Sequence, residues 1–224
     1  MLLFYHQPPD LSDRGYQAFS PNCRQVNVRN ASCCTIGYHS VSWVGSREGI
    51  IVEQHIAVAQ IYFFLIAALI VAAVHLYRDR QPRTWGRVAE VLLLWLLVID
   101  VGIGLVFGFI SHTVFATTAA ASIGWPAGNP FQTEVAIANL AFGTLGILCY
   151  WFRGQFWIAT VIGVSVWLVG DGIGHIYQII VANNYSPNNA GAALHNCFAT
   201  PLIIISLLLY QRHAVGGERE IARV

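Results

Sequence analysis

Five long apolar runs limit, more than any other feature, what this chain can fold into. They cover residues 55–77, 88–111, 131–152, 155–182 and 191–211. Each run reaches the roughly 20 residues that an α-helix needs to cross the hydrocarbon core of a bilayer. The sequence therefore predicts an all-α integral membrane bundle with about five transmembrane helices.

Composition agrees with a membrane protein and argues against other classes. Hydrophobic residues make up 56% of the chain and charged residues only 10%, with a mean hydropathy of +0.57. This is too apolar for an ordinary soluble domain. The net charge of +1 provides no basic face, so membrane lipids are expected partners and nucleic acid is not. All basic residues are arginine, a usage typical of GC-rich bacterial genes.

The arginines mark one side of the membrane. Those that follow the first apolar run lie in the first connection, the third connection and the tail: Arg78, Arg80, Arg83, Arg87, Arg153, Arg212, Arg219 and Arg223. The connections at 112–130 and 183–190 contain none. Because cytoplasmic loops are enriched in Lys and Arg, we expect a multi-pass protein of the bacterial inner (cell) membrane. Its carboxyl terminus, with the tail 215–224, is expected in the cytoplasm.

The two connections without arginine differ in character. Residues 112–130 are neutral and moderately apolar, which favours a short helix in the outer interface between the second and third spans. The other connection reads NNYSPNNAG and predicts a tight turn between antiparallel helices. Glycines at helical spacings in the second, third and fourth spans predict close packing of helix backbones. Residues 51–214 are therefore expected to form one transmembrane bundle.

Residues 1–50 are unlike the rest of the chain. They are rich in Ser, Asn, Arg and Cys and have no sustained period of 2 or 3.6. We expect a poorly structured amino-terminal segment. The alternative is a mis-annotated start, with translation beginning near Val52. The nucleotides of the gene over residues 45–54 distinguish the two, because a GTT, GTC or GTA codon at Val52 removes the alternative.

Polar side chains gather in the predicted outer half of the bundle. The stretch GDGIGHIYQ places Asp171, His175 and Gln178 at i, i+4 and i+7, on one face of the fourth helix. A carboxylate one turn from an imidazole fixes its orientation, which suits a proton relay or a metal-bound histidine. Charges in hydrocarbon are costly and mark functional sites. The sequence predicts a ligand pocket formed by Gln132, Glu134, Asn139, Asp171, His175, Gln178 and His195.

Two other interpretations of these residues stay open. The Asp171–His175 pair can be a satisfied intramembrane pair that orients the bundle. The outer histidines can bind a metal or haem, although neither HxxxH nor HExxH occurs. The five cysteines follow no CxxC spacing and are expected to act as small apolar residues. The sequence therefore predicts no metal site, and it identifies neither a cofactor nor a catalytic residue.

The segment IGWPAGNPFQTEVAIANLAFGTLGIL, followed by GDGIGHIYQ and NNYSPNNAG, resembles an uncharacterised family of small bacterial integral membrane proteins. The resemblance covers about residues 88–210, and its most specific phrase is FQTEVAIANLAFG. The same plan is distantly similar to the DoxX-like four-helix membrane proteins, some of which are associated with quinone-linked sulfur or redox chemistry. The resemblance implies a bundle with a polar outer pocket. The extra first span and residues 1–50 depart from the four-helix plan.

These observations favour an integral membrane protein of unidentified activity, accessory or binding a small lipophilic molecule in the outer pocket. One alternative is a membrane oxidoreductase component in which His175 and Asp171 handle a proton of a quinone-like substrate or hold a metal. Another is a small transporter or channel subunit, with Asp100 and Asp171 on a polar path. The sequence leaves open whether the protein is an enzyme and whether it forms a homo- or hetero-oligomer.

Overall fold

The structure is a computed structural model that describes the backbone of residues 47–221 and the side chains of residues 62–214. Every regular element in this part of the chain is helical, which confirms the all-α prediction. The elements are α1 (Arg47–Arg78), α2 (Trp85–Trp95), the π-helical segment η1 (Leu96–Ile103), α3 (Gly104–Thr113), α4 (Ala116–Ile123), α5 (Phe131–Leu148), α6 (Gln155–Ala182), α7 (Pro187–Ala190) and α8 (Ala192–Ile221). Apart from its last residues, the predicted segment 1–50 lies outside the described part.

Four helices of the described chain are long and apolar enough to cross a membrane. They are Trp85–Thr113, in which α2, η1 and α3 run on without a break, Phe131–Leu148, Gln155–Ala182 and Pro187–Ala214. The first predicted run lies in α1, whose described side chains form a shorter apolar helix, Tyr62–Arg78. The chain is thus a multi-pass membrane protein by length and composition of its helices, and a fifth span stays a prediction.

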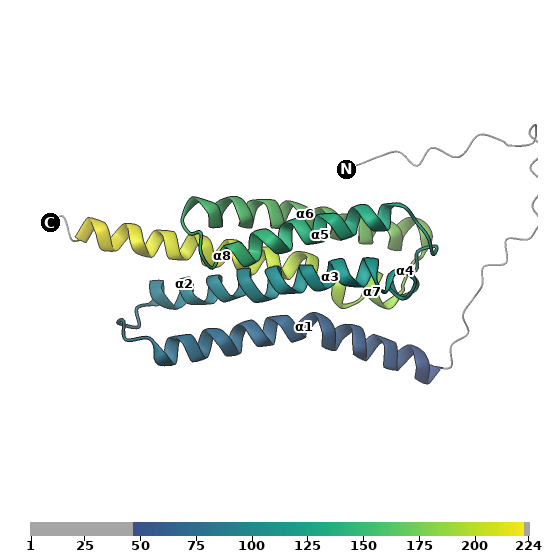
Figure 1. Cartoon of the computed structure of the whole chain (residues 1–224), viewed down its shortest axis with the longest axis horizontal. Helices are drawn as coiled ribbons and strands as arrows, with labels where there is room; N and C mark the ends of the chain where they lie inside the picture. The colour runs from purple at the N-terminus through teal and green to yellow at the C-terminus, as the bar shows by residue number, and fades with distance from the viewer. Residues whose placement is uncertain (1–46, 222–224) are drawn as a thin grey trace, which may run out of the picture. The chain divides into compact units, whose positions relative to one another are not determined.

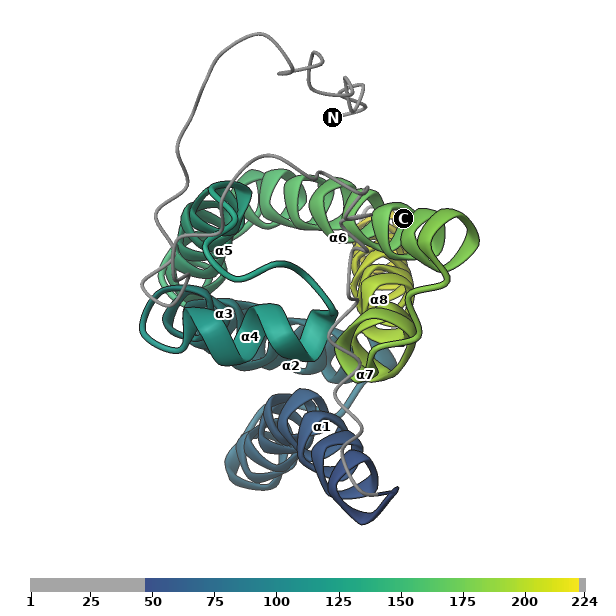
Figure 2. The same ribbon diagram turned by 90° about the vertical axis from the view of Figure 1, so that its right-hand side faces the viewer.

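The four long helices pack into a closed ring (Figure 1, Figure 2). The α2–η1–α3 stretch contacts α5 on one side and α8 on the other, and α6 contacts both α5 and α8. Helix α1 packs outside this ring, against α2 and η1. Fully buried aliphatic side chains fill the bundle: Leu93, Leu94, Leu97, Val161, Val164 and Ile204.

Specific residues determine where the helices begin and end. The Thr84 hydroxyl caps α2 by accepting a hydrogen bond from the Arg87 amide at 3.2 Å. Asn183 ends α6 in the left-handed conformation, with φ 49°, a position that Asn tolerates better than most residues. Helix α5 ends at Leu148, before the predicted end of its run at 152. The Tyr150 and Trp151 amides bond to the carbonyls of Ile147 and Leu148, three residues back, and the Cys149 carbonyl accepts the Trp157 indole N–H at 2.8 Å.

Glycines bring α5 and η1 into backbone contact. A Cβ atom on Gly146 would lie 2.6 Å from the Leu97 carbonyl oxygen and 2.8 Å from the backbone of Gly102. A Cβ atom on Gly143 would lie 2.9 Å from the Gly102 carbonyl oxygen. Real Cβ atoms essentially never approach other atoms this closely, so these positions accept only glycine. The predicted close packing of helix backbones is confirmed here.

Candidate functional site

Helices α6, α7 and α8 meet at the end of the bundle that carries α4 and α7, termed here the α4–α7 end (Figure 1). Asp171 and His175 lie one turn apart on α6, and Cys197 lies on α8 beside them. Gly172 permits this approach, because a Cβ atom there would lie 2.8 Å from the Phe198 ring and 2.9 Å from the Cys197 Cβ. Asp171, His175 and Cys197 are referred to below as the Asp–His–Cys cluster.

The orientation of His175 is fixed by Asn189 of α7. His175 is 8% exposed and Asn189 is fully buried. The Asn189 amide nitrogen donates to the Asn184 carbonyl at 2.8 Å and to the His175 carbonyl at 3.4 Å. Its oxygen therefore faces His175 Nδ1, at 2.8 Å. Because that oxygen can only accept, Nδ1 carries a proton, and the lone pair of a neutral ring is left on Nε2.

Asp171 faces both other members of the cluster. Its Oδ2 lies 3.5 Å from His175 Nε2, and the Cys197 thiol donates to the same oxygen at 3.7 Å. One ligand atom from each residue of the cluster lies within 4.8 Å of the other two. The expected pairing of Asp171 with His175 is confirmed, whereas Cys197 was expected to be only a small apolar residue.

Helices α4 and α7 close this end of the bundle over the cluster. The Asn184 amide donates to the Ile123 carbonyl at 2.8 Å, and the Asn188 amide donates to the Ser122 hydroxyl at 3.0 Å. Gly124 between them has φ 80°. The stretch NNYSPNNAG is therefore more than a turn, because its asparagines tie α7 to α4 and orient His175.

The remaining residues of the predicted pocket have other surroundings. The Gln132 amide donates to the Ala116 carbonyl at 2.7 Å and so joins α5 to α4. Asn139 is buried against Gly108 of α3. His195 Nδ1 pairs with the Tyr62 hydroxyl of α1 at 3.0 Å. Glu134 is exposed and Gln178 is partly exposed. No hydrogen bond among the described side chains joins these residues to the cluster, so their sharing one ligand stays a prediction.

Two further polar groups lie on the membrane-spanning helix Trp85–Thr113. His112, at the end of α3, has a buried Nδ1 without a hydrogen-bond partner among the described residues, and it lies within electrostatic range of Asp171. Asp100 lies in η1 beside the hydroxyl of Thr200 on α8. Thr200 in turn donates to Asn196 at 2.7 Å. Asp100, the only charged residue of η1, therefore has polar neighbours on α8.

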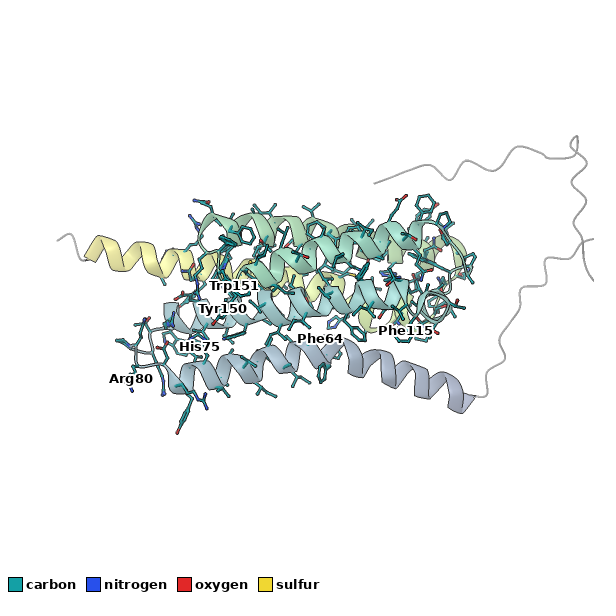
Figure 3. The ribbon with its side chains drawn as sticks, viewed as in Figure 1. Phe64, His75, Arg80, Phe115, Tyr150 and Trp151 are labelled. Atoms are coloured by element: carbon teal, nitrogen blue, oxygen red, sulfur yellow. The ribbon has the colours of Figure 1, made fainter. Side chains whose placement is uncertain are left out.

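A charged network holds the opposite end of the bundle. Arg87 pairs with Asp79 and with Glu90, each at 2.8 Å, and Glu90 also accepts from Arg153 at 3.0 Å. The α1–α2 and α5–α6 connections therefore lie at the same end, as the distribution of arginines requires. Figure 3 shows the labelled residues His75, Arg80, Tyr150 and Trp151 at this end and Phe115 at the other.

Asp79 makes the folded state sensitive to acid. Hydrogen bonds from the Gln81 amide and from Arg87 lower the pKa of the Asp79 carboxyl below its ordinary value of 3.8. The stabilisation is present above that value and is lost as the pH falls through the lowered pKa. We expect Asp79→Asn to lower the melting temperature at neutral pH and to flatten its decline below about pH 4. Glu134→Gln, a change at an exposed carboxylate, should leave this profile unaltered, and equal profiles for Asp79→Asn and the parent would contradict the role of Asp79.

The comparisons with known proteins place the chain in a family without assigning an activity. No curated protein and no solved structure matches it significantly. A family of unknown function, DUF6790, matches residues 59–217, which include α2 to α7 and all but the ends of α1 and α8. Because this match covers more than half of the sequence, the chain belongs to the DUF6790 family of unknown function.

Proposed function

We propose that this protein binds a small lipophilic molecule from within the membrane, through a polar pocket at the α4–α7 end of its bundle. The observation that supports this is the position of Asp171. Its side chain is 35% exposed, although it lies on a membrane-spanning helix. A charge so placed is costly in lipid and needs a partner.

The surface beside Asp171 can admit such a molecule. Gly170 and Gly174 form the neighbouring stripe of α6, and a Cβ atom on either would meet nothing within 4 Å. Ile173, Tyr177 and Ile180 on the same helix are exposed. An apolar body can therefore lie along α6 while a hydroxyl or carbonyl head contacts Asp171.

The same geometry supports proton exchange with the head of the ligand. Asp171 Oδ2 and His175 Nε2 face each other at 3.5 Å, so the pair can take up a proton from the head of the ligand or return one to it. Because Asn189 fixes the ring, only Nε2 is free to exchange a proton on the Asp171 side. This favours a quinone-like head and, as the second candidate, a component of a membrane oxidoreductase.

The proposal also includes four predictions made from the sequence. The protein has five membrane spans, and α4 lies in the outer interface. Its carboxyl terminus is in the cytoplasm of a bacterial cell with the bundle in the inner membrane, and it is distantly related to DoxX-like proteins. The proposed pocket also includes the other predicted residues: Gln132, Glu134, Asn139, Gln178 and His195. A transporter path through Asp100 has less support, because Asp100 has its own polar neighbours on α8.

Thermal shifts of the purified full chain test the proposal. A short-chain benzoquinone, its quinol and a fatty alcohol serve as probes, and an alkane of the same chain length serves as the apolar control. We expect at least one probe to raise the melting temperature of the parent by a few degrees and Asp171→Asn to abolish that rise. Asp100→Asn, the same change at another intramembrane acid, should retain it. No shift with any probe, or an equal shift in Asp171→Asn, would overturn the proposal.

A further inference from the structure

We propose that Asp171, His175 and Cys197 bind one thiophilic divalent metal ion, with Zn²⁺ as the best-matched ion. The inference uses residues of the proposed ligand pocket but does not require the lipophilic ligand. It begins with the chemistry of the three donors. A thiol sulfur, an imidazole nitrogen and a carboxylate oxygen converge from α6 and α8, with all three atoms within 4.8 Å of one another. These are the three donor types that Zn²⁺ binds in proteins.

The hydrogen bonding of His175 leaves a lone pair where a cation is needed. The Nδ1–H of His175 donates to the Asn189 oxygen, so Nε2 of the neutral ring points its lone pair at Asp171 Oδ2, 3.5 Å away. A lone pair facing a carboxylate is repulsive. The contact becomes favourable only when a proton or a metal ion lies between the two atoms. Asn189 would act on a bound metal as well, since it orients the ligating ring through its other nitrogen.

The Nε2–Oδ2 distance matches a metal site better than a direct hydrogen bond, and the Sγ–Oδ2 distance is compatible with a metal site. Metal–ligand bonds of about 2.0–2.3 Å in a tetrahedral site separate the ligand atoms by about 3.3–3.8 Å. The Nε2–Oδ2 distance is 3.5 Å and the Sγ–Oδ2 distance is 3.7 Å. A hydrogen bond between charged groups would instead be about 2.7–2.9 Å long. The two separations that involve Asp171 therefore match a tetrahedral site, and the remaining one, between the imidazole nitrogen and the Cys197 sulfur, lies within 4.8 Å.

Charge balance favours a divalent ion at this depth. Asp171 contributes one negative charge, and the Cys197 thiol contributes another after it releases its proton to solvent. Together they neutralise a divalent cation, so the loaded site carries no net charge into the membrane. The thiolate selects against Mg²⁺ and Ca²⁺, which prefer oxygen ligands.

The fourth coordination position of a tetrahedral metal ion at this site is open to a further ligand. Three protein ligands with one free position are typical of catalytic rather than structural zinc sites. His112 on α3 is a candidate, because its Nδ1 is buried without a partner among the described residues and the charge of Asp171 acts on its ring. Water or the head of the lipophilic ligand can take this position instead.

Co²⁺ titration of the purified full chain tests the inference, because a cobalt–thiolate bond gives a charge-transfer band in the near ultraviolet. The titration uses a background in which Cys23, Cys33 and Cys34 are serine, which leaves two cysteines in the chain. We expect one equivalent of Co²⁺ to produce the band, to release one proton and to be displaced by Zn²⁺. Absence of a stoichiometric band would overturn the inference.

Two cysteine variants show which thiol binds the metal ion. Cys197→Ala should abolish the band, whereas Cys149→Ala, at the buried cysteine of the other end, should leave it intact. The reverse result would overturn the inference. If Cys197→Ala does not fold, Asp171→Asn provides the assignment, with an expected loss of affinity of about tenfold or more and an altered band. A band that is unchanged in Asp171→Asn would also count against it.

The two proposals can fail separately. The probe-induced thermal shift is repeated on protein treated with a chelator. If the probes still raise the melting temperature and the protein binds no metal, the metal site is refuted and the ligand pocket stands. If the protein binds metal and no probe raises the melting temperature, the lipophilic ligand is refuted and the metal site stands.

Discussion

Replacing Gly146 with alanine is expected to prevent α5 from docking on η1. The added methyl group would lie 2.6 Å from the Leu97 carbonyl oxygen and 2.8 Å from the backbone nitrogen and Cα of Gly102. Overpacking usually costs about 1–3 kcal/mol, because side chains can move aside. Here all three contacts are backbone atoms, so we expect a loss above about 3 kcal/mol.

The measurement is the fraction of protein that remains monodisperse in detergent after heating. Gly170→Ala is the matched control, since a Cβ atom there would meet nothing within 4 Å. That control should melt at or slightly above the parent temperature, because alanine favours a helix more than glycine does. Equal melting temperatures for the two variants would contradict the packing of α5 on η1.

The contrast between these glycines shows what hydropathy and spacing predict and what they do not. Long apolar runs predicted the helices of the described chain, mostly to within a few residues. Glycines at helical spacing predicted close backbone approaches in general. They could not distinguish Gly146 and Gly172, which lie under a neighbouring helix, from Gly170, which lies on the open surface of α6. That distinction depends on which faces of the helices meet, and no pattern within one helix contains it.

The π-helical segment η1 also has no signal of its own. The stretch LLVIDVGI is apolar around most of its circumference, so a π-helical register and an α-helical one present the same hydrophobic pattern. Within this segment the Leu97 carbonyl lies against Gly146, and Asp100 lies beside Thr200. π-Helical turns are frequent at functional sites, yet here the contact with α5 already gives η1 a structural role.

The candidate site was predictable only where its residues share one helix. The i, i+4 spacing predicted that Asp171 and His175 would pair, and they do. Cys197 and Asn189 come from other elements, so no spacing rule for metal or catalytic motifs could find them. One signal was available for Asn189. The connection NNYSPNNAG contains four asparagines, more polar groups than a tight turn needs, directly after a helix with a buried histidine.

Replacing Asn189 with alanine is expected to destabilise the α4–α7 end and to release His175. Asn189 is fully buried, and its side chain bonds to the His175 ring at 2.8 Å and to the Asn184 carbonyl at 2.8 Å. The alanine variant leaves both of these groups without a partner. At about 1–3 kcal/mol for each such group, the loss is roughly 2–6 kcal/mol.

Asn188→Ala is the matched control, because this neighbouring asparagine makes one hydrogen bond, to the Ser122 hydroxyl, at a partly exposed position. We expect its melting temperature to fall much less than that of Asn189→Ala. A free His175 ring can also move its proton to Nε2, which removes the lone pair that a metal ion requires. Asn189→Ala should therefore weaken Co²⁺ binding about 10–100-fold, while Asn188→Ala binds as the parent does. Equal melting temperatures and equal affinities in the two variants would mean that Asn189 does not hold the ring.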